Sequence, residues 1–196
     1  MEWLGLLTKR NRPYSRTKMK KIEGCIVFGQ NIKNAREKQN ITKQKLAESI
    51  GYDRNSLSKL ERGEKNVQYK TAVRLAEALD VPFPKLFSRN YVDGRDRQAE
   101  KSLSMPEHFV QDDYLMVYIE NIRFKYLSQN LTQQDLASDS GLTKALVNMI
   151  LHKENKNPTI DTLYKMAKAA GGSLEEMFSR ASERENIDKQ YLPQDD

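Results

Sequence analysis

Cysteine, histidine and long apolar runs are scarce in this 196-residue sequence, and each shortage excludes a class of protein. A single cysteine, Cys25, cannot form an intramolecular disulfide, and no Cys/His cluster has the spacing of a metal site. The two histidines, His108 and His152, are far apart, and neither stands beside an obvious nucleophile. No apolar run approaches the roughly 20 residues needed to span a bilayer. We therefore expect a cytoplasmic protein that binds neither membrane, metal nor cofactor.

The sequence also lacks the residue patterns of an enzyme. It contains no glycine-rich phosphate-binding loop, no metal-ligand constellation and no convincing acid–base pair. These shortages predict a binding protein with no catalytic activity.

Positive charge is concentrated in the first half of the chain. Residues 1–90 hold 20 Lys and Arg against 9 Asp and Glu, a net charge of +11, whereas residues 91–196 carry a net charge of −5. A basic half attracts polyanions, because each phosphate neutralised by Lys or Arg releases condensed counterions. The two halves are therefore predicted to face different partners, and the first to bind nucleic acid at the nucleoid.

The sequence contains one small domain twice. Residues 31–47 match residues 121–137 at an offset of 90, and after one inserted residue Phe87 matches Phe178. The stretch between the copies is polar and contains Gly and Pro, as linkers do. We therefore predict a basic N-terminal arm at 1–24, a first domain at 25–89, a linker at 90–112, a second domain at 113–180 and a polar tail at 181–196.

The apolar residues within each copy are spaced as in helices. In the first copy Phe28, Ile32 and Ala35 follow one another at i, i+4 and i+7, and Thr42 and Asp53 stand where N-caps would open the next helices. No alternating strand pattern is present. The predicted fold class is all-α, with two tandem five-helix domains. The further helical segments expected in the first domain are 43–50, 54–62, 69–79 and 82–87.

The first copy closely resembles the XRE family of helix-turn-helix domains, which includes the phage lambda repressor and Cro type. The resemblance rests on ITKQKLA at 41–47, Gly51, DRNSLSKLERG at 53–63 and residues 71–76, and it covers nearly all of 27–88. It implies that the second helix lies across the DNA backbone and that the third enters the major groove.

The resemblance assigns DNA contacts to individual residues. An Arg or Lys can donate to guanine O6 and N7, an Asn can pair with adenine, and a Ser can bond either way. The predicted base-reading residues are Arg54, Asn55, Ser56 and Lys59. The predicted phosphate-binding residues are Thr42 and Lys43, at the start of the second helix, and Arg62, at the end of the third.

A pair of charges tests the resemblance. Arg36 and Glu61 occupy positions where phage repressors form a partly buried ion pair, and such a pair persists only when both members are present. In the second copy the equivalent residues are Tyr126 and Leu151, so both charges have been exchanged together. This supports the same fold in both halves.

The second copy keeps the scaffold but changes the residues on the third helix. The positions equivalent to the base-reading four are Lys144, Ala145, Leu146 and Met149. We predict a protein-contact face at Leu146 and Met149, because an exposed apolar helix face often marks a partner. The alternatives are docking on the first domain or a secondary DNA contact through Gln133, Lys144 and Asn148.

Basic residues are clustered ahead of the first helix. They could form an arm that reaches around the duplex, or they could belong to an unstructured, solvated tail. The candidate arm contacts are Lys9, Arg10, Arg12, Arg16, Lys18, Lys20 and Lys21.

These features predict a sequence-specific regulator of transcription that binds double-stranded operator DNA. We expect a repressor from a mobile element such as a plasmid or phage, acting as a homodimer or homotetramer, because dimers read paired half-sites. Relief of repression would come from an antirepressor protein. The alternative is an antitoxin or adaptor whose second domain binds a protein partner, with DNA binding serving autoregulation.

Overall fold

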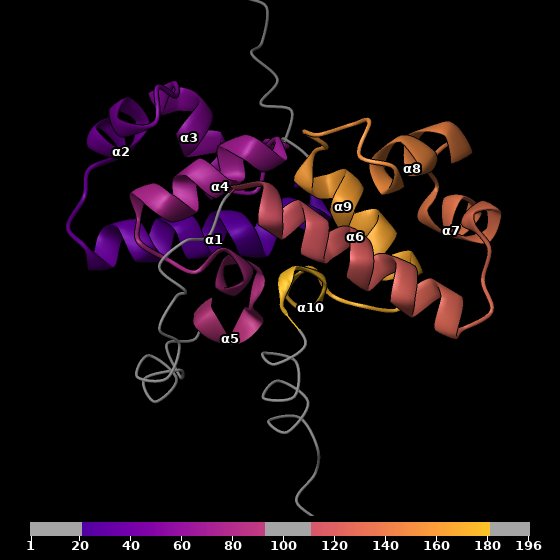
Figure 1. The fold of residues 1–196 in the computed structure, drawn as a ribbon. Coiled ribbons are helices and arrows are strands. Elements are labelled where there is room, and N and C mark those ends of the chain that lie inside the picture. The colour runs from indigo at the N-terminus through magenta and orange to yellow at the C-terminus, as the bar shows by residue number, and fades with distance from the viewer. Residues whose placement is uncertain (1–20, 93–110, 181–196) are drawn as a thin grey trace, which may run out of the picture.

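The computed structural model describes residues 21–92 and 111–180, which form two helical units of similar design (Figure 1). The first unit contains α1 (Glu23–Lys38), α2 (Lys43–Ser49), α3 (Arg54–Glu61), α4 (Tyr69–Ala78), the 3-10 helix η1 (Phe83–Phe87) and α5 (Arg89–Val92). The second contains α6 (Gln111–Ser128), α7 (Gln133–Ser140), α8 (Lys144–Leu151), α9 (Ile160–Ala169) and α10 (Leu174–Phe178). The prediction of two tandem all-α domains is confirmed.

The helix boundaries differ slightly from the predicted domain boundaries. α1 begins at Glu23, so the last two residues of the predicted arm form its first turn. α6 likewise begins at Gln111, inside the predicted linker. The remaining predicted arm residues, most of the linker and the tail after residue 180 lie outside the described residues.

Side-chain caps explain where α2 and α3, and their counterparts α7 and α8, begin. Thr42 Oγ1 accepts the backbone N–H of Lys45 at 3.1 Å, and Asp53 Oδ1 accepts that of Ser56 at 2.7 Å. Each bond satisfies a donor that the first turn of a helix leaves without a partner. In the second unit Thr132 and Thr143 cap α7 and α8 in the same way.

Residues with a left-handed backbone end the helices at matching positions in both units. Gly63 follows α3 with φ of +70°, and its counterpart Lys153 follows α8 with φ of +61°. A Cβ at Gly63 would lie 3.0 Å from the Cα of Ile26, so a larger residue would meet backbone there. The other matched pairs with positive φ are Asn40 and Asn130, Gly51 and Gly141, and Asp80 and Gly171.

The same residues are buried in both units. Residues 41–60 and 131–150 share one pattern of buried, half-buried and exposed positions, position by position. Asn31 on α1 donates to the carbonyls of Leu86 and Ser88, and Asn121 on α6 donates to those of Met177 and Ser179. In each unit a buried amide of the first helix therefore bonds to the C-terminal end of the equivalent short helix, η1 in the first unit and α10 in the second.

The two units pack against each other and share one core. Phe87 and Phe178, which are equivalent in the repeat, stack with ring centroids 5.3 Å apart. Phe83 contacts the same Phe178 ring at 4.8 Å, and the buried side chains of both units form a single cluster. The backbones also meet where α4 and α9 begin, through an antiparallel bridge between Gln68 and Thr159. The two backbone hydrogen bonds there run from Tyr69 N to Pro158 O and from Ile160 N to Val67 O, both at 2.8 Å.

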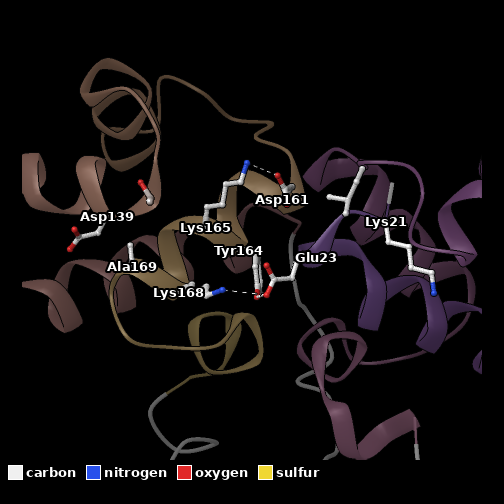
Figure 2. A pocket seen from close by; sticks show the side chains of 10 residues that line it. Lys21, Glu23, Asp139, Asp161, Tyr164, Lys165, Lys168 and Ala169 are labelled. Carbon is white, nitrogen blue, oxygen red and sulfur yellow. Dashed lines mark hydrogen bonds and ion pairs between the residues drawn. The ribbon is translucent and has the colours of Figure 1, made fainter. Parts of the chain in front are cut away.

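A polar contact joins the N-terminus of α1 to α9 beside this core. Glu23 accepts hydrogen bonds from the Tyr164 hydroxyl at 2.7 Å and from the Lys168 ammonium at 3.3 Å (Figure 2). Gly24 lies so close to Tyr164 that an added Cβ would stand 2.6 Å from the Tyr164 Cβ. Glu23, Tyr164 and Lys168 line a cleft of about 720 Å³ between the units, together with Lys21 and Asp139.

Candidate nucleic-acid interface

Buried apolar residues join α2 and α3 into a tight pair. Leu46 and Ala47 of α2 and Leu57 and Leu60 of α3 are each 1% exposed or less. The short connection between the two helices ends at Asp53, the N-cap of α3. Because the inward positions anchor both helices, the remaining positions of α3 form an outer surface of fixed geometry.

Three of the four predicted base-reading residues are exposed on this surface of α3. Arg54, Asn55 and Lys59 are exposed, whereas Ser56 is half-buried. The Ser56 hydroxyl accepts a hydrogen bond from Lys65 Nζ at 2.7 Å. Arg54, Asn55 and Lys59 can therefore reach a base edge directly, while Ser56 would first have to exchange its bond to Lys65.

Lys65 is a basic residue of this surface that the sequence analysis missed. Its ammonium lies 5.0 Å from the centroid of the Tyr52 ring, an arrangement that holds a cation over an aromatic face. It comes after the end of α3, outside the stretch that the helical spacing singled out. Only the folded connection to α4 brings it beside Ser56.

The three predicted phosphate-binding residues already have partners within the chain. Thr42 caps α2, Lys43 Nζ lies 3.3 Å from Glu61 Oε2, and Arg62 Nη2 lies 2.7 Å from Glu64 Oε2. The hydrogen bond from Arg62 lowers the pKa of the Glu64 carboxyl. A phosphate bound at Lys43 or Arg62 would therefore compete with a carboxylate for the cation.

The predicted ion pair is present and joins α1 to α3. Arg36 Nε donates to Glu61 Oε1 at 2.6 Å, with the two side chains 7% and 1% exposed. Arg36 also donates to the Ile41 carbonyl at 2.9 Å, and its bond to Glu61 raises the pKa of the guanidinium. The counterparts Tyr126 and Leu151 are both buried in the second unit. Two buried side chains without charge thus take the place of the ion pair there.

The corresponding surface of α8 is less apolar than its sequence suggests. Lys144, Ala145 and Met149 are exposed, Met149 by 41%, but Leu146 is half-buried and packs against the shared core. The candidate secondary DNA contacts are Lys144, which is exposed, and Gln133 and Asn148, which are half-buried. Of the predicted protein-contact face, only Met149 is largely free of the core.

The most exposed large apolar side chains among the described residues lie elsewhere. Phe124 is 68% exposed and Leu127 is 59% exposed, three residues apart on α6. Their counterparts in the first unit are Asn34 and Glu37. They are not among the site residues predicted from the sequence, although a comparison of the two copies at these positions shows the exchange of polar for apolar residues.

The described ranges, 21–92 and 111–180, contain no group of three or more His, Cys, Asp or Glu residues that could hold a metal ion. No helix in these ranges combines the length and apolar character needed to cross a bilayer. Lys21, of the candidate arm contacts, is exposed beside the cleft, and the others lie outside these ranges.

A tight helix pair whose second helix is exposed, found in each unit, defines the class of helix-turn-helix proteins. A model of the helix-turn-helix family HTH_3 matches residues 32–86 and again residues 122–177, more than half of the chain. The chain belongs to this family, and its resemblance to XRE-type domains is confirmed. It is a DNA-binding helix-turn-helix regulator of transcription.

Two curated proteins are similar to parts of the chain. Control protein C.SmaI of Serratia marcescens is 35% identical over 63 residues, which cover 32% of this chain and 75% of that protein. The uncharacterized HTH-type transcriptional regulator YqaE of Bacillus subtilis (strain 168) is 30% identical over 105 residues, which cover 49% of this chain and 90% of that protein.

Proposed function

We propose that this chain reads a specific operator in double-stranded DNA through α3 and represses transcription there. The observation that carries the proposal is the exposure of Arg54, Asn55 and Lys59 together on a helix whose opposite side is buried. These three side chains supply donors for guanine and a bidentate partner for adenine, which are the groups that distinguish bases in the major groove. We further propose that the chain is the repressor of a mobile element, by analogy with tandem regulators of phages and plasmids.

The charge of the chain supports this assignment. Residues 1–90 carry a net charge of +11, and one of their cations, Lys65, lies against the α3 surface. Such charge supplies the nonspecific part of DNA affinity, whereas side chains at base edges supply the preference for one sequence. One relative is named a control protein and the other an HTH-type transcriptional regulator, which supports a regulatory role.

In the first step of the test, the full chain selects a duplex from a library of DNA with about 30 random base pairs. This length is enough for two half-sites one helical turn apart. Asn55→Ala should raise the Kd for the selected duplex about 5- to 150-fold, the loss expected for one bidentate base contact. Its Kd for a scrambled duplex should not change, because phosphate contacts are retained.

The matched control is Asn34→Ala. Asn34 lies on α1, not on α3, and accepts a hydrogen bond from Gln30. The Asn34→Ala variant should bind the selected duplex with the same Kd as the unmodified chain. The proposal fails if Asn55→Ala binds the selected duplex as tightly as the control.

A further inference from the structure

The contact between the two units is reciprocal. Asn66 Nδ2 donates to Thr159 Oγ1 at 3.0 Å, and Asn157 Nδ2 donates to Gln68 Oε1 at 2.6 Å. At the offset of 91 that relates this part of the repeat, Asn66 is equivalent to Asn157 and Gln68 to Thr159. Each Asn thus bonds to the same position of the opposite unit.

The backbone follows the same rule. Asn66 Oδ1 accepts the N–H of Asp161 at 3.2 Å, and Asn157 Oδ1 accepts the N–H of Lys70 at 3.0 Å. Asp161 and Lys70 are themselves equivalent in the repeat. In an interface with twofold symmetry, as in homodimers, position i of one unit contacts position j of the other, and position j of the first unit contacts position i of the second. The two units are therefore related by an approximate twofold rotation within one chain.

This rotation carries α3 onto α8. Figure 1 shows α2 and α3 at one end of the molecule and α7 and α8 at the other, with α4 and α9 between them. Both α3 and α8 lie on the upper side in that view. Helix-turn-helix dimers use such an arrangement to place two reading helices in successive major grooves. The shared core, including the stacked Phe87 and Phe178, packs the units that carry these two helices against each other.

We propose that a single chain reads a two-part operator, with α3 on one half-site and α8 on the other half-site of the same duplex. The inference rests on the proposed function of α3 and adds a second DNA-contacting surface to it. One chain then supplies the pair of reading helices for which the sequence led us to expect a homodimer or homotetramer.

The residues of α8 suit a half-site different from the first. Lys144 is exposed at the position of Arg54 and keeps one positive charge. Thr143 caps α8 where Asp53 caps α3, so a carboxylate that would repel phosphate is absent. Ala145 and Met149 are exposed and can contact the C5-methyl group of thymine. The operator should therefore be asymmetric, with a half rich in A·T pairs beneath α8.

The test uses the full chain and the duplex selected from the random library. Sedimentation equilibrium should find one chain per duplex, and hydroxyl-radical footprinting should find two protected segments with centres about 10 base pairs apart. Lys144→Gln should weaken protection of one segment only. It should also reduce the slope of log affinity against log salt by about 0.9, because the bound chain would neutralise one DNA charge fewer.

Lys165→Gln is the matched control. Lys165 is an exposed lysine of α9 that pairs with Asp161, and its loss should leave the salt slope unchanged. Two chains per duplex, a single protected segment, or an unchanged slope for Lys144→Gln would each overturn the inference. None of these results would affect the role of α3, which fails only if Asn55→Ala leaves specific binding intact.

Discussion

At the scale of single residues, Arg36 and Glu61 show how a charged pair can be built into a small core. Both side chains are almost fully buried, and Glu61 is also approached by Lys43. Removing one member would leave a buried charge without its partner, which costs about 3–5 kcal/mol. The second unit, with Tyr126 and Leu151 buried at these positions, shows that an apolar pair fits the same fold.

A double substitution that copies the second unit tests this interpretation. Glu61→Leu should lower the free energy of unfolding by about 3 kcal/mol, because Arg36 stays buried without its carboxylate. Arg36→Tyr combined with Glu61→Leu should recover about 2 kcal/mol of that loss, because neither charge remains. Urea denaturation followed by circular dichroism would measure both.

The control for this pair is Glu37→Gln. Glu37 also pairs with Arg36, but its side chain is 53% exposed, so the change should be within about 0.5 kcal/mol. A double variant less stable than Glu61→Leu alone would contradict the interpretation.

At the scale of elements, the contact of α1 with α9 depends on the protonation of two groups. Burial first, and then the hydrogen bond to Glu23, raise the pKa of Tyr164 from its ordinary value of 10 to about 12. Hydrogen bonds from Tyr164 and Lys168 lower the pKa of Glu23 from its ordinary value of 4.5. The contact is therefore strongest when the phenol is protonated and the carboxyl is ionised. Both conditions hold at pH values between the lowered pKa of Glu23 and the raised pKa of Tyr164.

The pH dependence follows from the direction of each shift. Because the folded state holds the Tyr164 proton more tightly, its stabilising contribution is complete below pH 10 and is lost as the pH rises towards 12. The contribution of Glu23 is complete above pH 4.5 and is lost as the pH falls through its lowered pKa. Between pH 10 and pH 12, the range of the Tyr164 shift, the unmodified chain should lose more stability than Tyr164→Phe.

Urea titrations of both proteins at several alkaline pH values would measure this difference. Tyr118, which is fully buried and also has a raised pKa, is present in both proteins, so its effect cancels in the comparison. Equal losses of stability would show that Tyr164 does not contribute through its hydroxyl proton.

At the scale of the whole molecule, the two units form a single folded body. Phe178 lies between them, with ring contacts to Phe83 and Phe87 of the first unit and to Tyr118 of the second. Its side chain is 1% exposed. The structure therefore predicts one cooperative unfolding transition for both units.

Phe178→Ala tests this coupling. The truncation should cost about 3–5 kcal/mol, as large-to-small changes at buried aromatic residues do. Hydrogen exchange should show reduced protection in α1 and α4 as well as in α6 and α9, because the lost contacts belong to both units. Loss of protection confined to the second unit would contradict a shared core.

The sequence by itself determined the local structure of this protein. Helix starts at Thr42 and Asp53 follow from side chains that cap their own first turns, and the inward positions follow from apolar spacing along each helix. The repeat predicted the second unit, and the joint exchange of Arg36 and Glu61 predicted that the two units share one fold. These features depend on residues close in sequence, or on a comparison of two aligned segments.

Only the tertiary structure decided how the units meet. Asn66 and Thr159 lie 93 residues apart, and nothing in the local pattern indicates that they bond. The same holds for Leu146, which packs against the shared core, and for Lys65, whose ammonium donates to Ser56. Such contacts depend on how complete helices pack, so they are set by the shape and burial of the whole core. That packing joins a domain and its repeat into one molecule with α3 and α8 at its two ends.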